Sequence, residues 1–117
     1  MSYSLYLAVN NTEEVECGDM TYNMRPLLDF AFAEGREAYW VDVLAMPKTL
    51  GQLSSLLLAV TNRLVHMGLA GELSEWDSPN GWGTGEQVRD FVRGLLGATV
   101  SATRRHGADA EAEFWVC

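Results

Sequence analysis

Basic residues are scarce in this chain. Its 117 residues include 8 lysines and arginines against 16 aspartates and glutamates, which gives a formal net charge of -8. A protein that binds nucleic acid unaided needs a basic surface to displace counterions from the phosphates. The composition therefore argues against direct nucleic-acid binding.

Long apolar runs and an export signal are also missing. The longest uninterrupted apolar stretch, residues 56–60, is far shorter than the roughly 20 residues that cross a bilayer. Residues 1–9 lack the basic segment that opens a signal peptide. We therefore expect a cytoplasmic protein that does not enter the membrane.

Metal ligands and catalytic motifs are few. The chain has 2 cysteines, Cys17 and Cys117, and 2 histidines, without the spacing of a zinc site. The two thiols could pair, although two reduced cysteines suit a cytosolic protein. No Gly-x-Ser-x-Gly elbow occurs, and neighbouring acids such as Glu13 and Glu14 stand in polar stretches. We expect no metal and no cofactor. An enzymatic activity is possible, but no residue pattern in the sequence supports one.

Apolar residues are plentiful. At 48% hydrophobic and 10% aromatic residues the chain can form one core, so it is expected to fold as a single globular domain over residues 1–117.

The first half of the chain predicts a strand and a helix. Residues 3–9 alternate in the two-residue period of a strand, and residues 13–18 are interpreted as an acidic loop. A helix is expected to begin at Asn23, with Pro26 in its first turn and Gly35 closing it. Residues 37–45 fit either a strand or a helix, and we favour an extended segment.

The second half predicts two longer helices. Residues 49–68 carry an apolar seam and a Thr49/Gln52 capping box, with Gly68 as the expected stop. The members of the seam are Leu50, Leu53, Leu57, Val60, Leu64 and Met67, and it is widened by Leu56, Leu58 and Val65.

A long irregular loop over residues 69–83 is expected to lead into the last helix. A second capping box, Thr84 with Gln87, opens this helix, and Gly107 ends it. Gly94 and Gly97 weaken this helix intrinsically, so we expect them to allow close packing of another helix.

The C-terminal residues 113–117 read as a strand that pairs with the N-terminal one, because a lone strand cannot satisfy its backbone. The expected fold is α+β, a small sheet pairing the N- and C-terminal strands and packed against about three helices.

Two helix starts carry the candidate binding residues. The glycine-rich run Asn80, Gly81, Trp82, Gly83 and Thr84 leads into a helix N-terminus, whose free amides and dipole favour anions. Alternatively, this run is an ordinary turn before a capped helix, with Trp82 in the core.

The earlier helix start would add Tyr22 and Asn23, with Arg25 as the nearest cation. If both starts open into one cleft, these residues form a ligand-binding site. Otherwise this segment only caps the helix, with Tyr22 packed behind the cap.

The segments Thr21-Tyr22-Asn23 and Asn80-Gly81-Trp82-Gly83-Thr84 resemble a loosely defined set of small proteins of tailed bacteriophages. In that set a strand precedes a Tyr-Asn helix start, and an Asn-Gly-Trp-Gly loop leads into a later helix. Members of that set usually have Ser or Thr just before the proline of the first helix, and Arg25 departs from this pattern. The resemblance implies a phage setting, hence the host cytoplasm, but no activity.

Two functions follow as hypotheses. The first is a non-enzymatic accessory protein that binds and inhibits a host protein, such as a defence factor, because aromatic residues dominate interface hot spots. The alternative is a binder that sequesters a small anionic nucleotide at the converging helix starts. Either could form a homo-oligomer.

Overall fold

The computed structural model describes residues 1–34 and 36–117. Three antiparallel strands form a sheet with the spatial order β2-β1-β3. The strands are β1 (Ser2–Val9), β2 (Thr12–Thr21) and β3 (Ala112–Val116). This arrangement confirms the expected α+β fold, in which the N-terminal and C-terminal strands pair.

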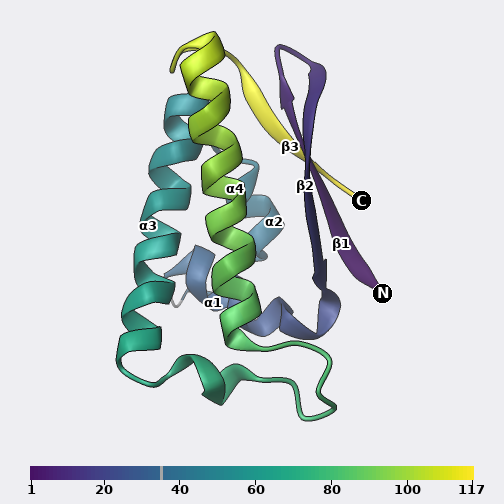
Figure 1. The fold of residues 1–117 in the computed structure, drawn as a ribbon, viewed down its shortest axis with the longest axis vertical. Helices are drawn as coiled ribbons and strands as arrows, with labels where there is room; N and C mark the ends of the chain where they lie inside the picture. The colour runs from purple at the N-terminus through teal and green to yellow at the C-terminus, as the bar shows by residue number, and fades with distance from the viewer. Residues whose placement is uncertain (35) are drawn as a thin grey trace.

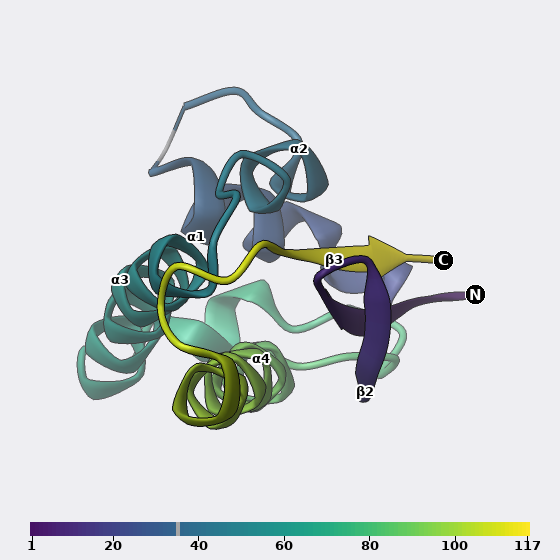
Figure 2. The same cartoon turned by 90° about the horizontal axis from the view of Figure 1, so that it is seen from above.

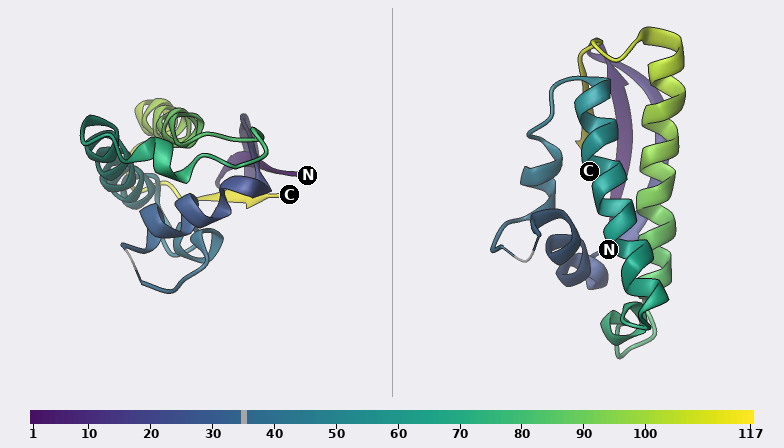
Figure 3. Two further views of the ribbon diagram at one scale, coloured as in Figure 1. Left: turned by 90° about the horizontal axis from the view of Figure 1, so that it is seen from below. Right: turned by 90° about the vertical axis from the view of Figure 1, so that its left-hand side faces the viewer.

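Two long antiparallel helices, α3 and α4, lie side by side next to this sheet (Figures 1 and 3). The helical elements are η1 (Tyr22–Met24), α1 (Arg25–Ala33), α2 (Trp40–Leu44), α3 (Leu50–Leu69), η2 (Leu73–Trp76) and α4 (Gly85–His106). Among the helices of residues 1–34 and 36–117, none combines the length and apolarity needed to cross a membrane.

All the helices lie on one side of the sheet, as the view from above shows (Figure 2). On that side β1 buries Tyr3, Leu5, Leu7 and Val9 completely or nearly so. The opposite side of the sheet carries no helix in the described part of the chain. The sheet therefore has one face in the core and one open face.

The prediction of an acidic loop over residues 13–18 is wrong, because β2 runs through them. Asn10 and Asn11 both have positive φ, 52° and 63°, and Val9 pairs with Thr12. This two-residue turn has the conformation that matches the twist of a hairpin, so the chain returns at once as a second strand.

The first helix starts differently from the prediction. Thr21, not Asn23, is the cap: its hydroxyl accepts a hydrogen bond from the Asn23 backbone N–H at 3.4 Å. A short η1 turn follows before α1, and Pro26 lies in the first turn of α1 as expected. At the other end Glu34 adopts the left-handed conformation at φ 55°. The predicted stop, Gly35, lies outside the described residues.

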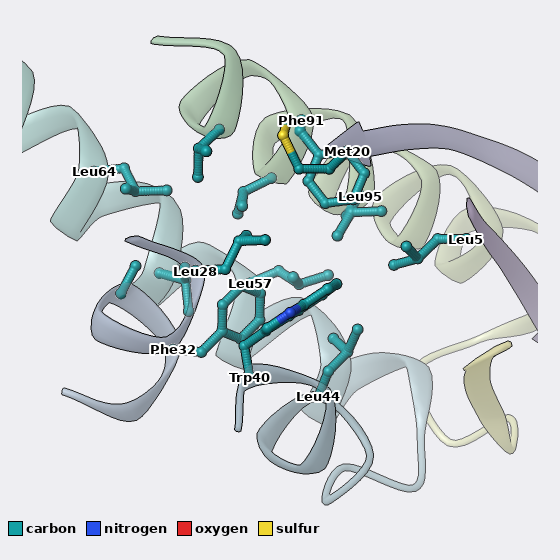
Figure 4. Close-up of a cluster of buried hydrophobic side chains, with 14 of the residues drawn as sticks. Leu5, Met20, Leu28, Phe32, Trp40, Leu44, Leu57, Leu64, Phe91 and Leu95 are labelled. Atoms are coloured by element: carbon teal, nitrogen blue, oxygen red, sulfur yellow. The ribbon is translucent and has the colours of Figure 1, made fainter. Parts of the chain in front are cut away.

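Of residues 37–45, Trp40–Leu44 form the short helix α2 and none lies in a strand, so the extended segment that we favoured is wrong. The Trp40 backbone N–H donates to the Asp29 carboxylate at 2.8 Å, which satisfies a free amide of the first turn. The Trp40 side chain is fully buried and lies with Phe32 and Leu44 in the core (Figure 4). The helix thus carries both Trp40 and Leu44 into the core.

The seam of α3 is confirmed, because all six of its members are buried. Leu58 does not widen it, since this side chain is 51% exposed. The helix also continues past Gly68 to Leu69, and the left-handed glycine after it is Gly71, at φ 75°. At its start Thr49 caps the helix, but the Gln52 side chain accepts from the Lys48 N–H instead of completing a capping box with Thr49.

The ends of α4 agree with the sequence prediction: Thr84 and Gln87 form a capping box, and Gly107 follows the last turn. Gly94 and Gly97 do not pack against another helix. A Cβ atom built at either position would meet no other atom within 4 Å. Both glycines therefore face open space.

Candidate functional site

A groove of about 780 Å³ lies between the end of β2, the start of α4 and the loop that precedes α4. Its lining residues are Cys17, Gly18, Asp19, Met20, Thr21, Gly81, Trp82, Gly83, Gln87, Asp90 and Phe91. Gly81, Trp82 and Gly83 form one side of this groove. Residues 78–84, which contain them, are called the Trp82 loop below.

The Trp82 loop is held by its own short-range hydrogen bonds. The Asn80 side-chain oxygen accepts from the Trp82 N–H at 3.0 Å and from the Ser78 hydroxyl at 2.5 Å. The Ser78 N–H donates to the Gly83 carbonyl at 3.0 Å, and the Gly81 N–H donates to the Ser78 carbonyl at 3.0 Å. These bonds fix the backbone on both sides of Trp82.

The loop is also fastened to the first helix start, so the structure brings the two predicted segments together. The Asn23 side-chain amide donates to the Trp82 carbonyl at 3.3 Å. Gly83, at φ 137°, packs so tightly that an added Cβ would lie 2.7 Å from Met24 Cγ and 2.8 Å from Thr21 Cγ2. Only glycine permits this approach.

The indole of Trp82 projects from this fixed backbone and is 70% exposed. The alternative prediction, which placed Trp82 in the core, is therefore wrong. Trp76, the other tryptophan of the predicted irregular loop, lies in η2 and packs on Phe30 with ring centres 5.1 Å apart.

Five of the predicted site residues do not line the groove, namely Tyr22, Asn23, Arg25, Asn80 and Thr84. The Tyr22 ring packs on Tyr3 with centroids 4.4 Å apart and remains 41% exposed. Arg25 pairs with Asp29 at 3.2 Å, and its guanidinium lies 4.1 Å from the Tyr39 ring centre. Arg25 therefore belongs to a separate hollow beside Asp29 and Tyr39.

Near Arg25, hydrogen bonding to Tyr3, together with burial, raises the pKa of Tyr39 to about 12. An ordinary tyrosine is already protonated at neutral pH, so this shift leaves the charge near Arg25 unchanged.

The helix N-terminus of α4 is already occupied by the chain's own acceptors. The Gly85 N–H donates to the Asp77 carboxylate at 2.8 Å, and the Gln87 N–H donates to the Thr84 hydroxyl at 3.1 Å. The Thr84 N–H donates to the Gln87 side chain at 3.1 Å. Three of the amides that could have cradled an anion are thus satisfied internally, one of them by a carboxylate.

Sequence reasoning missed the floor of the groove. Met20 and Phe91 are buried there, and Asp19 and Asp90 add negative charge at its sides. The misassigned residues 13–18 concealed this strand wall, which includes Cys17. Burial raises the pKa of the Cys17 thiol, which disfavours the reactive thiolate. With its buried Met20 and Phe91, the groove is suited to binding an apolar or aromatic group.

Comparison of the chain with models of protein families, with curated proteins and with solved structures finds no match.

Proposed function

We propose that the protein is a non-enzymatic binding protein that engages a partner protein through the Trp82 loop. The observation that carries this proposal is a large aromatic side chain, 70% exposed, on a backbone fixed from both sides. Buried tryptophans are among the strongest interface hot spots, and truncating such a residue costs about 2 kcal/mol or more of binding free energy.

The rigidity of the loop favours tight binding. Ordering the loops and side chains of an interface costs free energy when two proteins associate. The bonds of Asn80 within the loop, and of Asn23 to it, place Trp82 before a partner arrives. The adjoining groove, with Met20 and Phe91 in its floor, offers a second apolar contact beside the indole.

More specifically, we propose a non-enzymatic phage accessory protein that binds and inhibits a host protein. This more specific proposal rests on the resemblance of the Tyr22-Asn23 and Asn80–Thr84 segments to the small phage proteins. Inhibition would result from occupying a functional surface of the partner.

Sequestration of a small anionic nucleotide is the alternative. The contact between Asn23 and the Trp82 loop favours it, because the two helix starts do meet. Asp19 and Asp90 beside the groove, and the pairing of Arg25 with Asp29 elsewhere, oppose an anionic ligand. A protein partner therefore fits the groove better.

The test is affinity capture from a bacterial lysate with three immobilised proteins: the wild type, Trp82→Ala and Leu69→Ala. Leu69 is 83% exposed at the end of α3 and is the matched control for loss of an exposed apolar side chain. The proposal expects one stoichiometric protein on the wild type and on Leu69→Ala, and its loss from Trp82→Ala.

Small molecules released from the same samples by heat are analysed by mass spectrometry. A nucleotide retained by the wild type and lost from Trp82→Ala, without a protein, would favour the alternative. Equal capture of the protein by all three samples would contradict the role of Trp82.

A further inference from the structure

The open side of the sheet has a composition of its own. Paired residues of neighbouring strands point to the same side, so the register fixes which side chains share this face. We call it the outer sheet face and define it by Tyr6, Ala8, Glu13, Glu16, Asp19, Glu113 and Trp115.

Two aromatic rings lie at the centre of the outer sheet face. Tyr6 of β1 pairs directly with Trp115 of β3, and both side chains are partly exposed. The Trp115 indole N–H donates to the Glu113 carboxylate at 2.9 Å, which orients the indole on the sheet. The two residues are called the aromatic platform, and by register both side chains point away from the core.

Carboxylates surround this platform. Glu16 pairs with Tyr6, while Glu13 and Glu113 both pair with Ala8, and Asp19 lies further along β2. All four acids are exposed, and none forms an ion pair within residues 1–34 and 36–117.

Among the described residues, no cation neutralises this face. The three strands contain no lysine, arginine or histidine. Lys48 lines a hollow with Glu113, but its ammonium group donates to the Ala45 carbonyl at 3.3 Å. The charge of Glu16, followed by burial and by the charges of Cys117, Glu13 and Asp19, raises the pKa of the Tyr6 phenol.

We propose that the outer sheet face binds an arginine-rich segment of a partner protein, with guanidinium groups stacked on Tyr6 and Trp115 and paired with Glu16 and Glu113. Arginine fits this face better than lysine, because its planar guanidinium stacks on aromatic rings and binds carboxylates through two parallel hydrogen bonds. This surface does not include Trp82, although Asp19 lies both on it and beside the groove, and it takes a partner of different chemistry.

The test measures binding of fluorescein-labelled octa-arginine by fluorescence anisotropy at about 0.15 M salt, where distant charges are screened. The double variant Glu16→Gln/Glu113→Gln removes two negative charges from the outer sheet face, and the amide oxygen that replaces the Glu113 carboxylate can still accept from the indole. Glu72→Gln/Glu75→Gln is the matched control, since it removes two exposed negative charges near η2.

Glu16→Gln/Glu113→Gln is expected to raise the dissociation constant about fivefold, because two exposed ion pairs are lost. The control Glu72→Gln/Glu75→Gln should raise it by less than about twofold. Trp115→Leu is expected to weaken binding about threefold, whereas Trp115→Phe, which keeps a ring, retains most of the affinity. Octa-lysine should bind more weakly than octa-arginine, and Trp82→Ala should bind like the wild type.

Absence of octa-arginine binding would overturn the proposal. Equal weakening by the two double variants, or equal affinity for octa-lysine, would also overturn it, because the net charge alone would then explain the binding. Far-ultraviolet circular dichroism of each variant checks that the fold is intact. This experiment is independent of the capture experiment. Loss of octa-arginine binding would leave the role of Trp82 untouched, and equal capture by Trp82→Ala would leave the role of the outer sheet face untouched.

Discussion

At the residue scale, the two tryptophans near the start of α4 differ in what their side chains touch. Trp76 packs on Phe30, whereas the Trp82 side chain projects into solvent and only its backbone is bonded. Stability and binding are therefore expected to depend on different tryptophans.

We predict that Trp76→Ala lowers the free energy of unfolding by about 2 kcal/mol, because part of a large buried area is lost. Trp82→Ala is expected to change it by less than about 0.5 kcal/mol, as is usual for an exposed position. Urea denaturation followed by circular dichroism measures both values. A loss for Trp82→Ala as large as that for Trp76→Ala would mean that the indole stabilises the fold.

Glu14 gives the second residue-scale prediction. Its carboxylate accepts from Arg105 at 2.7 Å and lies 3.2 Å from His106 Nε2, joining the hairpin to the end of α4. The Arg105 hydrogen bond, followed by that of His106, holds the pKa of Glu14 below its usual value. A carboxyl whose pKa is lowered by folding stabilises the fold above its unfolded pKa, near 4.3, and loses that contribution as the pH falls through the folded value.

Glu14→Gln is therefore expected to lower the melting temperature at pH 7, and its difference from the wild type should shrink as the pH falls below about 4.3. Glu13→Gln, whose carboxylate has no such partner among the described residues, is the control. A difference for Glu14→Gln that stays constant from pH 7 into the acid range would contradict a role for the ion pair.

At the scale of elements, α4 carries two glycines that packing does not require. Because nothing lies within 4 Å of an added Cβ, Gly94→Ala and Gly97→Ala should each stabilise the protein by up to about 1 kcal/mol. Thermal unfolding should show a rise of a few degrees for each.

Gly85→Ala is the contrasting control in the same helix. A Cβ there would overlap the Leu73 carbonyl oxygen, so this substitution should be destabilising. If Gly94→Ala and Gly97→Ala also lowered the melting temperature, these glycines would have a packing role that the structure does not show.

The elements predicted correctly are those whose signals are local. The α3 seam follows the helical period, and the Thr84 cap needs only residues close in sequence. β2 could not be recognised from alternation, because irregularities in its pairing opposite Leu5/Tyr6 and Leu7/Ala8 interrupt the two-residue period. The paired asparagines Asn10 and Asn11 were the available hairpin signal.

The candidate site was predictable in part for the same reason. The sequence marked Asn23 and Trp82 as helix-start residues, and the structure joins them. It could not show that Arg25 turns toward Asp29 and Tyr39, because those contacts depend on how α1 and the segment before α2 pack. The exposure of Leu58 on α3 likewise depends on which neighbours cover the helix.

At the scale of the whole molecule, the sheet keeps the two cysteines apart. Cys17 belongs to β2 and Cys117 follows β3, with β1 between those strands. Two strand spacings place their Cα atoms about 9–10 Å apart, beyond the reach of a disulfide, which is about 7 Å.

We therefore predict that the monomer contains two free thiols that react at different rates. Cys117 is exposed and should react quickly with a thiol reagent, whereas burial and the raised pKa of Cys17 should make it slow. Mass spectrometry of the timed reaction at about pH 8, near the ordinary thiol pKa, assigns each rate. A monomer that takes up no reagent until it is reduced would contradict the arrangement of the strands.

Trp82 is proposed to anchor a protein partner, and the dissociation constant of the captured protein is the decisive measurement of that role. Titrations by calorimetry compare the wild type with Trp82→Ala, Trp82→Phe and Leu69→Ala. Trp82→Ala is expected to weaken binding about thirtyfold or more and Trp82→Phe less, while Leu69→Ala leaves it unchanged. A dissociation constant for Trp82→Ala within about twofold of the wild type would contradict the claim.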